Sequence, residues 1–513
     1  MIYMRTFKLD NLKDNSLDCI LDLKNFVENF VGQKIFNINL KKFSKLLNCD
    51  PDVLILKTKK LIVSEFDYKK NKFNDFSTFF NILKDFFIYL YIFFLLIFCS
   101  KKRNSLKTDI MLFNVDQFDE IEKFKKILKH YNHSVIITDK IFNLKNIKEN
   151  LSDQYLKNNL NAKYENNFLN LTYKDKNEKI SFRTVIKFKK NIPFCNECIK
   201  EKYQVFKFGF YLFFLSLSNN FNFLKIYNNL FYSYIRNYSI FKVYSSKYLI
   251  QDRVFSTCPI RNHIFKKLGG KIAACVQSHI TEASISLYND TDILFTFGDE
   301  QNSKNFSKEL GSRIDKSFPV GSLRSESFFI NSNESFHLDK KIDILIFGVN
   351  LFNWLYLNKT TYNNYYKFIE IMKQISLRYP NLKIFLKHHS NNYKKEDIKE
   401  QEILKESNIK YLSSFTNTYT YIKNTKLFFS FSSSMILETC GLRGSSYFID
   451  PEEKNFVFFQ KNKSLNKIRL SSFENVDEII KKVLIEKKQL THNFNDICMK
   501  SDNVSKLIVS KLN

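Results

Sequence analysis

The order of apolar and polar positions divides the chain into an N-terminal stretch with one long apolar run and a longer region of alternating patterns. In that longer region, short apolar runs typical of buried parallel strands alternate with segments that carry apolar residues at helical spacing. The first set covers residues 108–330 and the second residues 341–513, with a polar linker at residues 331–340. The pattern predicts an α/β protein with two Rossmann-like, doubly wound domains behind a helical N-terminal extension, residues 1–107.

Particular runs give the expected elements. Strands are predicted at residues 109–115, 134–138, 241–245, 271–277, 292–297, 318–320, 342–347, 382–387, 409–412, 427–431 and 446–449. Helices are predicted at residues 116–130, 260–268, 281–288, 303–310, 362–379, 395–407 and 419–424, and from the following turn to residue 440. Residues from about 140 to 235 break the alternation and are interpreted as an insertion. The C-terminal residues are predicted to be helical and to pack back across the interdomain cleft.

The long apolar run lies at residues 86–99 and reads FFIYLYIFFLLIFC, with Lys101, Lys102 and Arg103 close behind it. Fourteen residues fall short of the about 20 that a helix needs to cross a bilayer. We therefore expect monotopic or re-entrant membrane contact, with a buried core helix as the alternative. The aromatic stretch at residues 206–241 fits the same surface or the core. Since no signal peptide is evident, the expected location is the inner face of the cytoplasmic membrane.

The composition shows a large excess of basic over acidic residues. The chain has 80 Lys and Arg against 52 Asp and Glu, a formal charge of +28, which attracts phosphate-rich partners. The lysines are spread along the chain, so compositional drift explains the charge equally well. Nine cysteines show no regular framework, which suits a reducing compartment. Cys195 and Cys198 form a lone CxxC without the second ligand pair that a zinc site needs, so no bound metal is expected.

Ligands of open α/β sheets bind beyond the carboxyl ends of the strands, which draws attention to residues 277–279, 348–350, 387–390 and 431–438. The last of these segments contains Ser432, Ser433 and Ser434 between a strand and a helix, where backbone N–H groups and the helix dipole favour a phosphate. A simple helix cap, which needs one serine, is the alternative.

Lys387 and the adjoining histidines, His388 and His389, follow another predicted strand. A lysine and a histidine at a strand end are suited to hold a diphosphate and to stabilise the charge that builds on it as it leaves. His279, at a strand end of the first domain, is the first candidate for the base that activates a hydroxyl acceptor, with Glu282 and Asp299 as alternatives. A structural histidine is the competing interpretation for this position.

Taken in order, these segments resemble the bacterial surface-polysaccharide transferases: the CDP-glycerol glycerophosphotransferase, polysialyltransferase and capsule glycosyltransferase group. The resemblance covers about residues 240 to 460. Residues 387–390 look similar to the family's basic residue, spacer and His-Pro, with His389 in the histidine place and the proline absent. The serines and Glu438 match a Ser-rich turn before a helix with a Glu.

Three further segments carry the resemblance. Residues 292–298 look similar to the family's strand that ends in a Gly, and residues 321–326 to its Gly-x-x-Arg-x-acid stretch, which makes Arg324 a candidate interdomain phosphate contact. Residues 277–279 only approximate the family's Gln-His-Gly.

The resemblance implies a GT-B fold in which the second domain binds the nucleotide of an activated donor. It places Gly348, Asn350, Lys387, His389, Ser432, Ser433, Ser434 and Glu438 at the nucleotide, with His279 and His389 as the catalytic pair. The first domain takes a glycan or lipid-linked acceptor, and no metal or other bound cofactor is implied. Two competing classes are a basic membrane- or nucleic-acid-binding protein without catalysis, and a GT-B-type nucleotide-sugar epimerase. The transferase interpretation expects no nucleic-acid partner.

Overall fold

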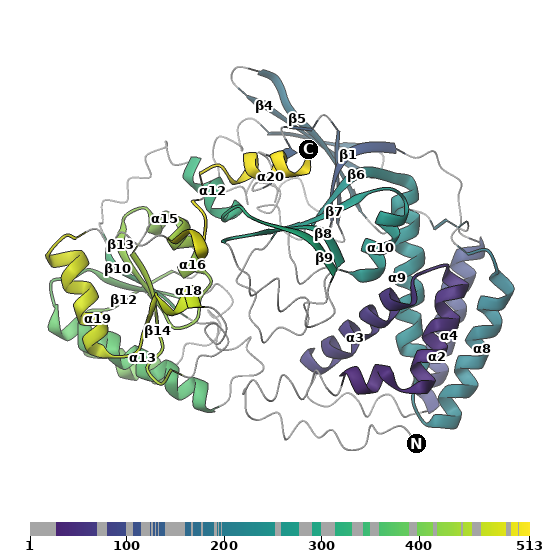
Figure 1. The fold of residues 1–513 in the computed structure, drawn as a ribbon, viewed down its shortest axis with the longest axis horizontal. Coiled ribbons are helices and arrows are strands. Elements are labelled where there is room, and N and C mark those ends of the chain that lie inside the picture. The colour runs from purple at the N-terminus through teal and green to yellow at the C-terminus, as the bar shows by residue number, and fades with distance from the viewer. Residues whose placement is uncertain are drawn as a thin grey trace.

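The computed structural model places three parts in a row: a helical unit, a first sheet domain and a second sheet domain (Figure 1). The structure describes residues 27–68, 79–98, 106–113, 124, 127–128, 130–131, 133–138, 160–165, 168–175, 178–188, 192, 194–195, 197, 199–251, 258–275, 290–298, 313–330, 342–348, 359–388, 398–413, 418–442, 445–453, 463–488, 494–500 and 502–513. All structural statements below concern these residues.

The first domain is built on a nine-stranded sheet with the order β3-β4-β5-β2-β1-β6-β7-β8-β9. From β5 to β9 neighbouring strands are parallel, whereas β3 and β4 add an antiparallel edge. The strands are β1 (Leu106–Phe113), β2 (Ser134–Thr138), β3 (Leu160–Glu165), β4 (Phe168–Asp175), β5 (Glu178–Phe188), β6 (Tyr244–Gln251), β7 (Lys271–Cys275), β8 (Asp290–Thr296) and β9 (Arg313–Pro319). Because β2 and β5 lie on one side of β1 and the later strands on the other, the sheet is doubly wound.

The second domain has a six-stranded, wholly parallel sheet with the order β12-β11-β10-β13-β14-β15. Its strands are β10 (Ile342–Phe347), β11 (Ile384–Lys387), β12 (Lys410–Leu412), β13 (Thr425–Ser430), β14 (Ser445–Ile449) and β15 (Arg469–Leu470). Its helices are α13 (Lys359–Arg378), α14 (Ile398–Leu404), α15 (Tyr419–Ile422), α16 (Met435–Gly441), α18 (Lys463–Asn466) and α19 (Phe473–Ile480). Central strands such as β10 form continuous apolar runs because helices cover both faces of the sheet. In order of appearance the strands run 3-2-1-4-5-6, the strand order of a Rossmann-like sheet.

The helical unit combines two segments that are distant in the sequence. Helices α2 (Lys34–Leu47), α3 (Pro51–Tyr68) and α4 (Phe79–Phe98) pack with α8 (Lys202–Asn219) and α9 (Phe223–Val243), which come from the segment interpreted as an insertion. One apolar core runs through these helices and on to one face of the first sheet. The Tyr89 hydroxyl donates to the Val205 carbonyl at 2.7 Å, and a Cβ at Gly209 would lie 2.3 Å from the Tyr89 ring. Gly209 therefore lets α4 and α8 approach closely.

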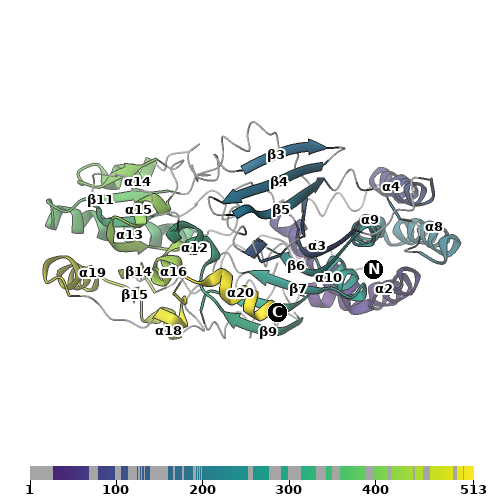
Figure 2. The same ribbon diagram turned by 90° about the horizontal axis from the view of Figure 1, so that it is seen from above.

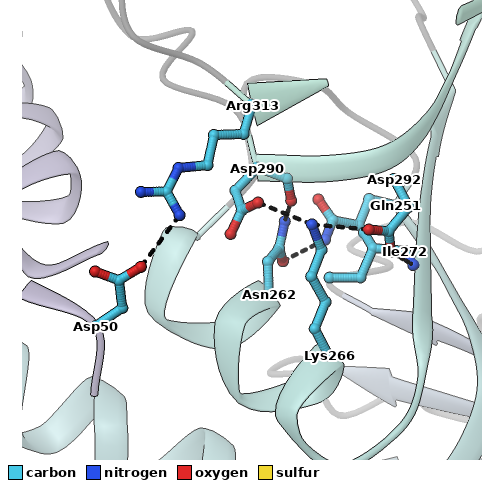
Figure 3. A network of polar contacts seen from close by, with 8 residues as sticks. All are labelled: Asp50, Gln251, Asn262, Lys266, Ile272, Asp290, Asp292 and Arg313. Atoms are coloured by element: carbon cyan, nitrogen blue, oxygen red, sulfur yellow. Dashed lines mark hydrogen bonds and ion pairs between the residues drawn. The ribbon is translucent and has the colours of Figure 1, made fainter. Parts of the chain in front are cut away.

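A polar network fixes this helical unit against the first domain (Figure 3). Asp50, just before α3, pairs with Arg313 at the start of β9, with 3.2 Å between Oδ2 and NH1. On α10 (Pro259–Lys267), the Asn262 amide donates to the Asp290 carbonyl at 2.6 Å, and Lys266 Nζ lies 2.9 Å from the Asp290 carboxylate. Helix α10 thus connects the sheet to the unit at the end of β8 that lies away from the second domain.

The carboxyl ends of β8 and β9 contact the second domain. Met499, beyond the short turn η10 (Phe494–Asp496), donates its N–H to the Phe297 carbonyl at 2.7 Å. The chain then returns to the first domain as α20 (Val504–Leu512), where the Tyr248 hydroxyl donates to the Leu512 carbonyl. The C-terminal residues are therefore helical and pack back on the first domain, as the sequence predicts. Two doubly wound domains joined in this way make a GT-B-like fold.

Two predicted strands differ from the structure. Residues 241–243 continue α9, and β6 begins at Tyr244. Phe241 and Val243 favour a strand by type, but Phe241 packs in the helical core with its ring centroid 4.9 Å from that of Phe265. Strand β9 begins at Arg313, ahead of the predicted residues 318–320, because this edge strand carries charged residues in place of an apolar run. The helices predicted at residues 281–288 and 303–310 lie outside the described residues.

Candidate functional site

The second sheet changes direction between β10 and β13, which are neighbours although β11 and β12 come between them in the chain. In doubly wound sheets this switch point opens a crevice beyond the carboxyl ends of the two strands. Gly348 follows β10, and the serines follow β13. The Ser430 hydroxyl donates to the Phe347 carbonyl at 2.8 Å and accepts from the Ser432 N–H at 3.2 Å, which ties the two strand ends together.

The three serines of the turn have different surroundings. Ser433 Oγ accepts from the Met435 N–H at 3.3 Å and so caps the seven-residue helix α16. Ser434 has helical backbone angles and makes no side-chain cap bond. Ser432 is buried, with 6% of its surface exposed, and within the described part of the chain its hydroxyl has no hydrogen-bond partner. Ser433 therefore caps the helix, whereas the Ser432 hydroxyl at the switch point can still donate and accept a hydrogen bond.

A histidine closes the other side of Gly348. A Cβ at Gly348 would lie 2.3 Å from His388 Nδ1, so only glycine leaves room for the imidazole at this strand end. His388 Nε2 lies 2.8 Å from Glu400 Oε1, and the ring stacks on Tyr411 with 6.0 Å between centroids. Among the described residues His388 Nδ1 has no partner. With Nε2 donating to the carboxylate, a neutral ring presents a lone pair at Nδ1 and a protonated ring presents an N–H.

Glu400, on α14, holds this histidine in place. Its buried carboxylate also accepts from the Tyr365 hydroxyl and from the Tyr411 hydroxyl, the latter at 2.9 Å. Burial raises the pKa of Glu400, but the hydrogen bonds from His388 and the two tyrosines outweigh it and hold that pKa below its usual range. An ionised carboxylate at Nε2 fixes the imidazole orientation, so that Nδ1 is directed at Gly348.

Lys387 and Glu438, both predicted nucleotide contacts, have protein partners in the structure. Lys387 is buried, its Nζ donates to the Ser413 carbonyl at 2.8 Å, and burial lowers its pKa. The Glu438 carboxyl, 1% exposed, accepts from the hydroxyls of Ser322 at 2.9 Å and Ser325 at 3.0 Å. It also accepts from the Tyr419 hydroxyl. Glu438 therefore links the second domain to α12 (Leu323–Ile330) of the first.

Arg324 lies on the same helix, and its charge acts across the interface on Tyr419 of the second domain. Burial, followed by the neighbouring Glu438 carboxyl, raises the pKa of Tyr419 well above its usual value, whereas Arg324 lowers it. Arg324 therefore lies at the junction of the two domains, and the phosphate contact expected for it stays a prediction.

Several predicted residues lie outside the described part of the chain: His279, Glu282, Asp299, Asn350, His389 and Cys198. Cys195 is described, and burial raises the pKa of its thiol. No group of three or more metal-ligating side chains occurs among the described residues.

Sequence reasoning gave the histidine role to His389 and did not find the support of His388. Tyr365, Glu400 and Tyr411 come from three different elements, so no local spacing connects them. The one usable signal was a glutamate four residues before Leu404, on the buried face of α14.

Comparison with known proteins gives structural likeness alone. No family model and no curated protein sequence matches the chain. A UDP-GlcNAc 2-epimerase from Neisseria meningitidis bound to UDP-GlcNAc is similar over 79% of this chain and 99% of its own, with a TM-score of 0.46 and 10% identity. The UDP-GlcNAc 2-epimerase from Methanocaldococcus jannaschii has a TM-score of 0.40 and 12% identity over 79% of this chain and 98% of its own.

Acinetobacter baumannii MurG is similar over 79% of this chain and 99% of its own, with a TM-score of 0.37 and 10% identity. At such low identity and TM-score, no residue role is carried from these proteins to this chain. The doubly wound topology of the two domains is what defines its fold.

Proposed function

We propose that the protein is a nucleotide-sugar-dependent glycosyltransferase, or a related polyol-phosphate transferase, whose donor binds at the second-domain switch point. One observation supports this above the others: Ser432 Oγ and His388 Nδ1 are unpaired there among the described residues. Buried polar groups in native proteins are normally paired, so two such atoms at the place where doubly wound sheets bind ligands favour a polar ligand.

A diphosphate suits these groups. The Ser432 hydroxyl donates to a phosphate oxygen, and a protonated His388 donates from Nδ1 while Glu400 compensates its charge. Gly348 leaves room for the imidazole of His388 at this strand end. The same donors stabilise the negative charge that develops on the diphosphate when the sugar departs. His389 and Asn350 complete this site in the proposal.

The first domain is the proposed acceptor site for a glycan or lipid-linked glycan, with His279 as the base that takes the acceptor proton. Removal of a general base typically slows the reaction about 100- to 10,000-fold and leaves donor affinity nearly intact. We expect His279→Ala to bind donor normally and to transfer poorly. Near wild-type turnover with saturating acceptor would move the role to Glu282 or Asp299.

Thermal-shift and calorimetric titration with UDP, CDP, GDP and CMP and their sugar or glycerol derivatives tests the donor site. Ser432→Ala should weaken binding of the preferred nucleotide about tenfold or more, because a hydrogen bond to a charged group contributes about 1.5 to 3 kcal/mol. Ser510→Ala, an exposed serine on α20, is the matched control. Equal affinity of a folded Ser432→Ala protein would exclude this site.

Product analysis separates the two enzyme classes. A transferase consumes donor in proportion to acceptor, whereas a nucleotide-sugar epimerase converts the donor when no acceptor is present. Conversion without acceptor would therefore replace the transferase proposal by the epimerase. Salt-dependent binding of nucleic acid, with no nucleotide binding, would replace both.

A further inference from the structure

Helices α4 and α8 lie side by side on the outside of the helical unit, at the end of the molecule opposite the second domain (Figure 2). They run antiparallel, since Phe86 contacts Phe213 with ring centroids 4.7 Å apart while Phe93 contacts Phe206 at 5.3 Å. Their inner sides are buried against α9 and against each other. The outer sides of both helices face away from the protein.

These outer sides are aromatic. On α4 the exposed residues Phe87, Tyr91, Phe94 and Phe98 recur at intervals of four, three and four, which places them in one stripe. On α8, Phe210 and Phe214 continue the apolar surface. We call these six residues the α4/α8 face. An exposed aromatic patch of this extent marks a docking surface rather than ordinary protein surface.

Lysines occur on both helices of the face and on the neighbouring α2, whereas acidic residues are nearly absent from these helices. Neither α8 nor the neighbouring α2 contains Asp or Glu. Lys207 lies over the Tyr203 ring at 4.4 Å, and Lys42 of α2 over the Tyr211 ring at 5.4 Å. Lys84 is exposed on α4. A second copy of this face would bring lysines against lysines, whereas an anionic lipid surface complements them.

Among the helices that the structure describes, only α4 meets the length and hydropathy of a membrane span. It has 20 residues and a mean hydropathy of 1.9, so it is longer than the fourteen-residue apolar run. Its inner side, however, holds polar partners. The Asn222 amide donates to the Asp85 carboxylate at 2.6 Å, and the Asn228 amide donates to the Asp85 carbonyl at 2.7 Å. Helix α9, against which it packs, passes directly into β6 at Tyr244. A spanning α4 would lose these contacts and the core that it shares with α9.

We infer that the α4/α8 face docks the protein on an anionic lipid bilayer, with both helices parallel to the membrane plane. The aromatic rings enter the boundary between headgroups and acyl chains, and the lysines of these helices bind the headgroups. This inference is independent of the proposed donor site, which lies in the second domain.

Vesicle co-sedimentation tests the inference on the full chain. Wild-type protein should bind vesicles of phosphatidylcholine and phosphatidylglycerol and should be released by an alkaline carbonate wash. Phe87→Ser with Tyr91→Ser and Phe94→Ser should reduce partitioning onto the vesicles at least about tenfold. The variant lacks three large apolar side chains whose transfer from water into the bilayer favours binding. Leu377→Ser with Ile485→Ser, both exposed in the second domain, is the matched control and should bind as wild type.

Charge is tested separately. Lys84→Glu with Lys207→Glu should reduce binding to the anionic vesicles by more than about fivefold for each lysine and should leave binding to pure phosphatidylcholine nearly unchanged. Unchanged vesicle binding by the triple serine variant, with an intact thermal transition, would overturn the inference. Retention of the wild-type protein on vesicles after the carbonate wash would also overturn it, because that result indicates a membrane span. A third contradicting result would be a wild-type protein that does not bind vesicles but forms a dimer, which the triple serine variant does not form.

Discussion

Two buried polar clusters of the second domain differ in one respect. Around Glu438, at the domain junction, the carboxyl group accepts from three hydroxyls, two of them from the first domain. At the switch point, Ser432 Oγ and His388 Nδ1 have no partner among the described residues. Both clusters contain residues that the sequence pattern placed near a nucleotide. Buried polarity alone therefore does not mark a ligand site, since the hydrogen-bonding groups around Glu438 are paired within the protein itself.

Glu438→Ala should have the largest effect on stability. The change leaves the hydroxyls of Ser322, Ser325 and Tyr419 buried without their acceptor, and each unsatisfied group costs about 1 to 3 kcal/mol. We expect the free energy of unfolding, measured in urea, to fall by about 3 kcal/mol or more. Glu406→Ala, at an exposed ion pair, should change it by less than about 1 kcal/mol. A loss no larger than that control would mean that the junction does not depend on this carboxyl.

Gly348→Ala should have the next largest effect, and it acts on both stability and binding. The new Cβ would lie 2.3 Å from His388 Nδ1, so the imidazole must leave its place beside Glu400. Overpacking of this kind costs about 1 to 3 kcal/mol. Nucleotide affinity should fall with it. Gly32→Ala is the matched control, since nothing lies within 4 Å of its Cβ position. Wild-type nucleotide affinity in Gly348→Ala would show that His388 does not contribute to the site.

The Glu400 network predicts a pH dependence. A carboxyl whose pKa is lowered in the folded protein contributes stability above its unfolded pKa, close to 4.5, and loses it as the pH falls through the folded value. The difference in unfolding free energy between wild type and Glu400→Gln should therefore shrink as the pH falls below about 4.5. Taking the difference cancels the other carboxylates. A difference that is constant from neutral pH to about pH 3 would contradict the assigned network.

Ser432→Ala should have the smallest effect on stability of these four changes. Its hydroxyl has no partner in the described structure, so its removal should leave the free energy of unfolding unchanged or slightly higher. The same change should weaken nucleotide binding, as proposed above. A clear loss of stability would show that the hydroxyl is satisfied within the protein, as the Glu438 carboxyl is.

The alternation of strand and helix patterns was enough to predict two doubly wound domains. It did not predict β3, β4 and β5 of the first sheet, which lie in the segment interpreted as an insertion. Apolar runs such as residues 342–347 and 427–431 can be buried only as central strands, and their order gave the strand ends where Gly348 and the serines lie. Local pattern failed where packing outweighed propensity, as at Phe241, or where an edge strand lacked an apolar run, as in β9. The C-terminal helix was also predictable, because its apolar spacing is local.

Only the tertiary structure decided which polar residues are satisfied and which are not. His388 follows β11 and Glu400 lies on α14, so their contact depends on how the two elements pack. Glu438 contacts serines that are more than a hundred positions away in the chain. Likewise, α4 and α8 form one exposed aromatic face although about a hundred residues separate them. Sequence periodicity reports which side of an element is buried, because that depends on neighbours within one or two turns. Hydrogen-bond partners and shared surfaces depend on contacts between distant segments, which the fold alone brings together.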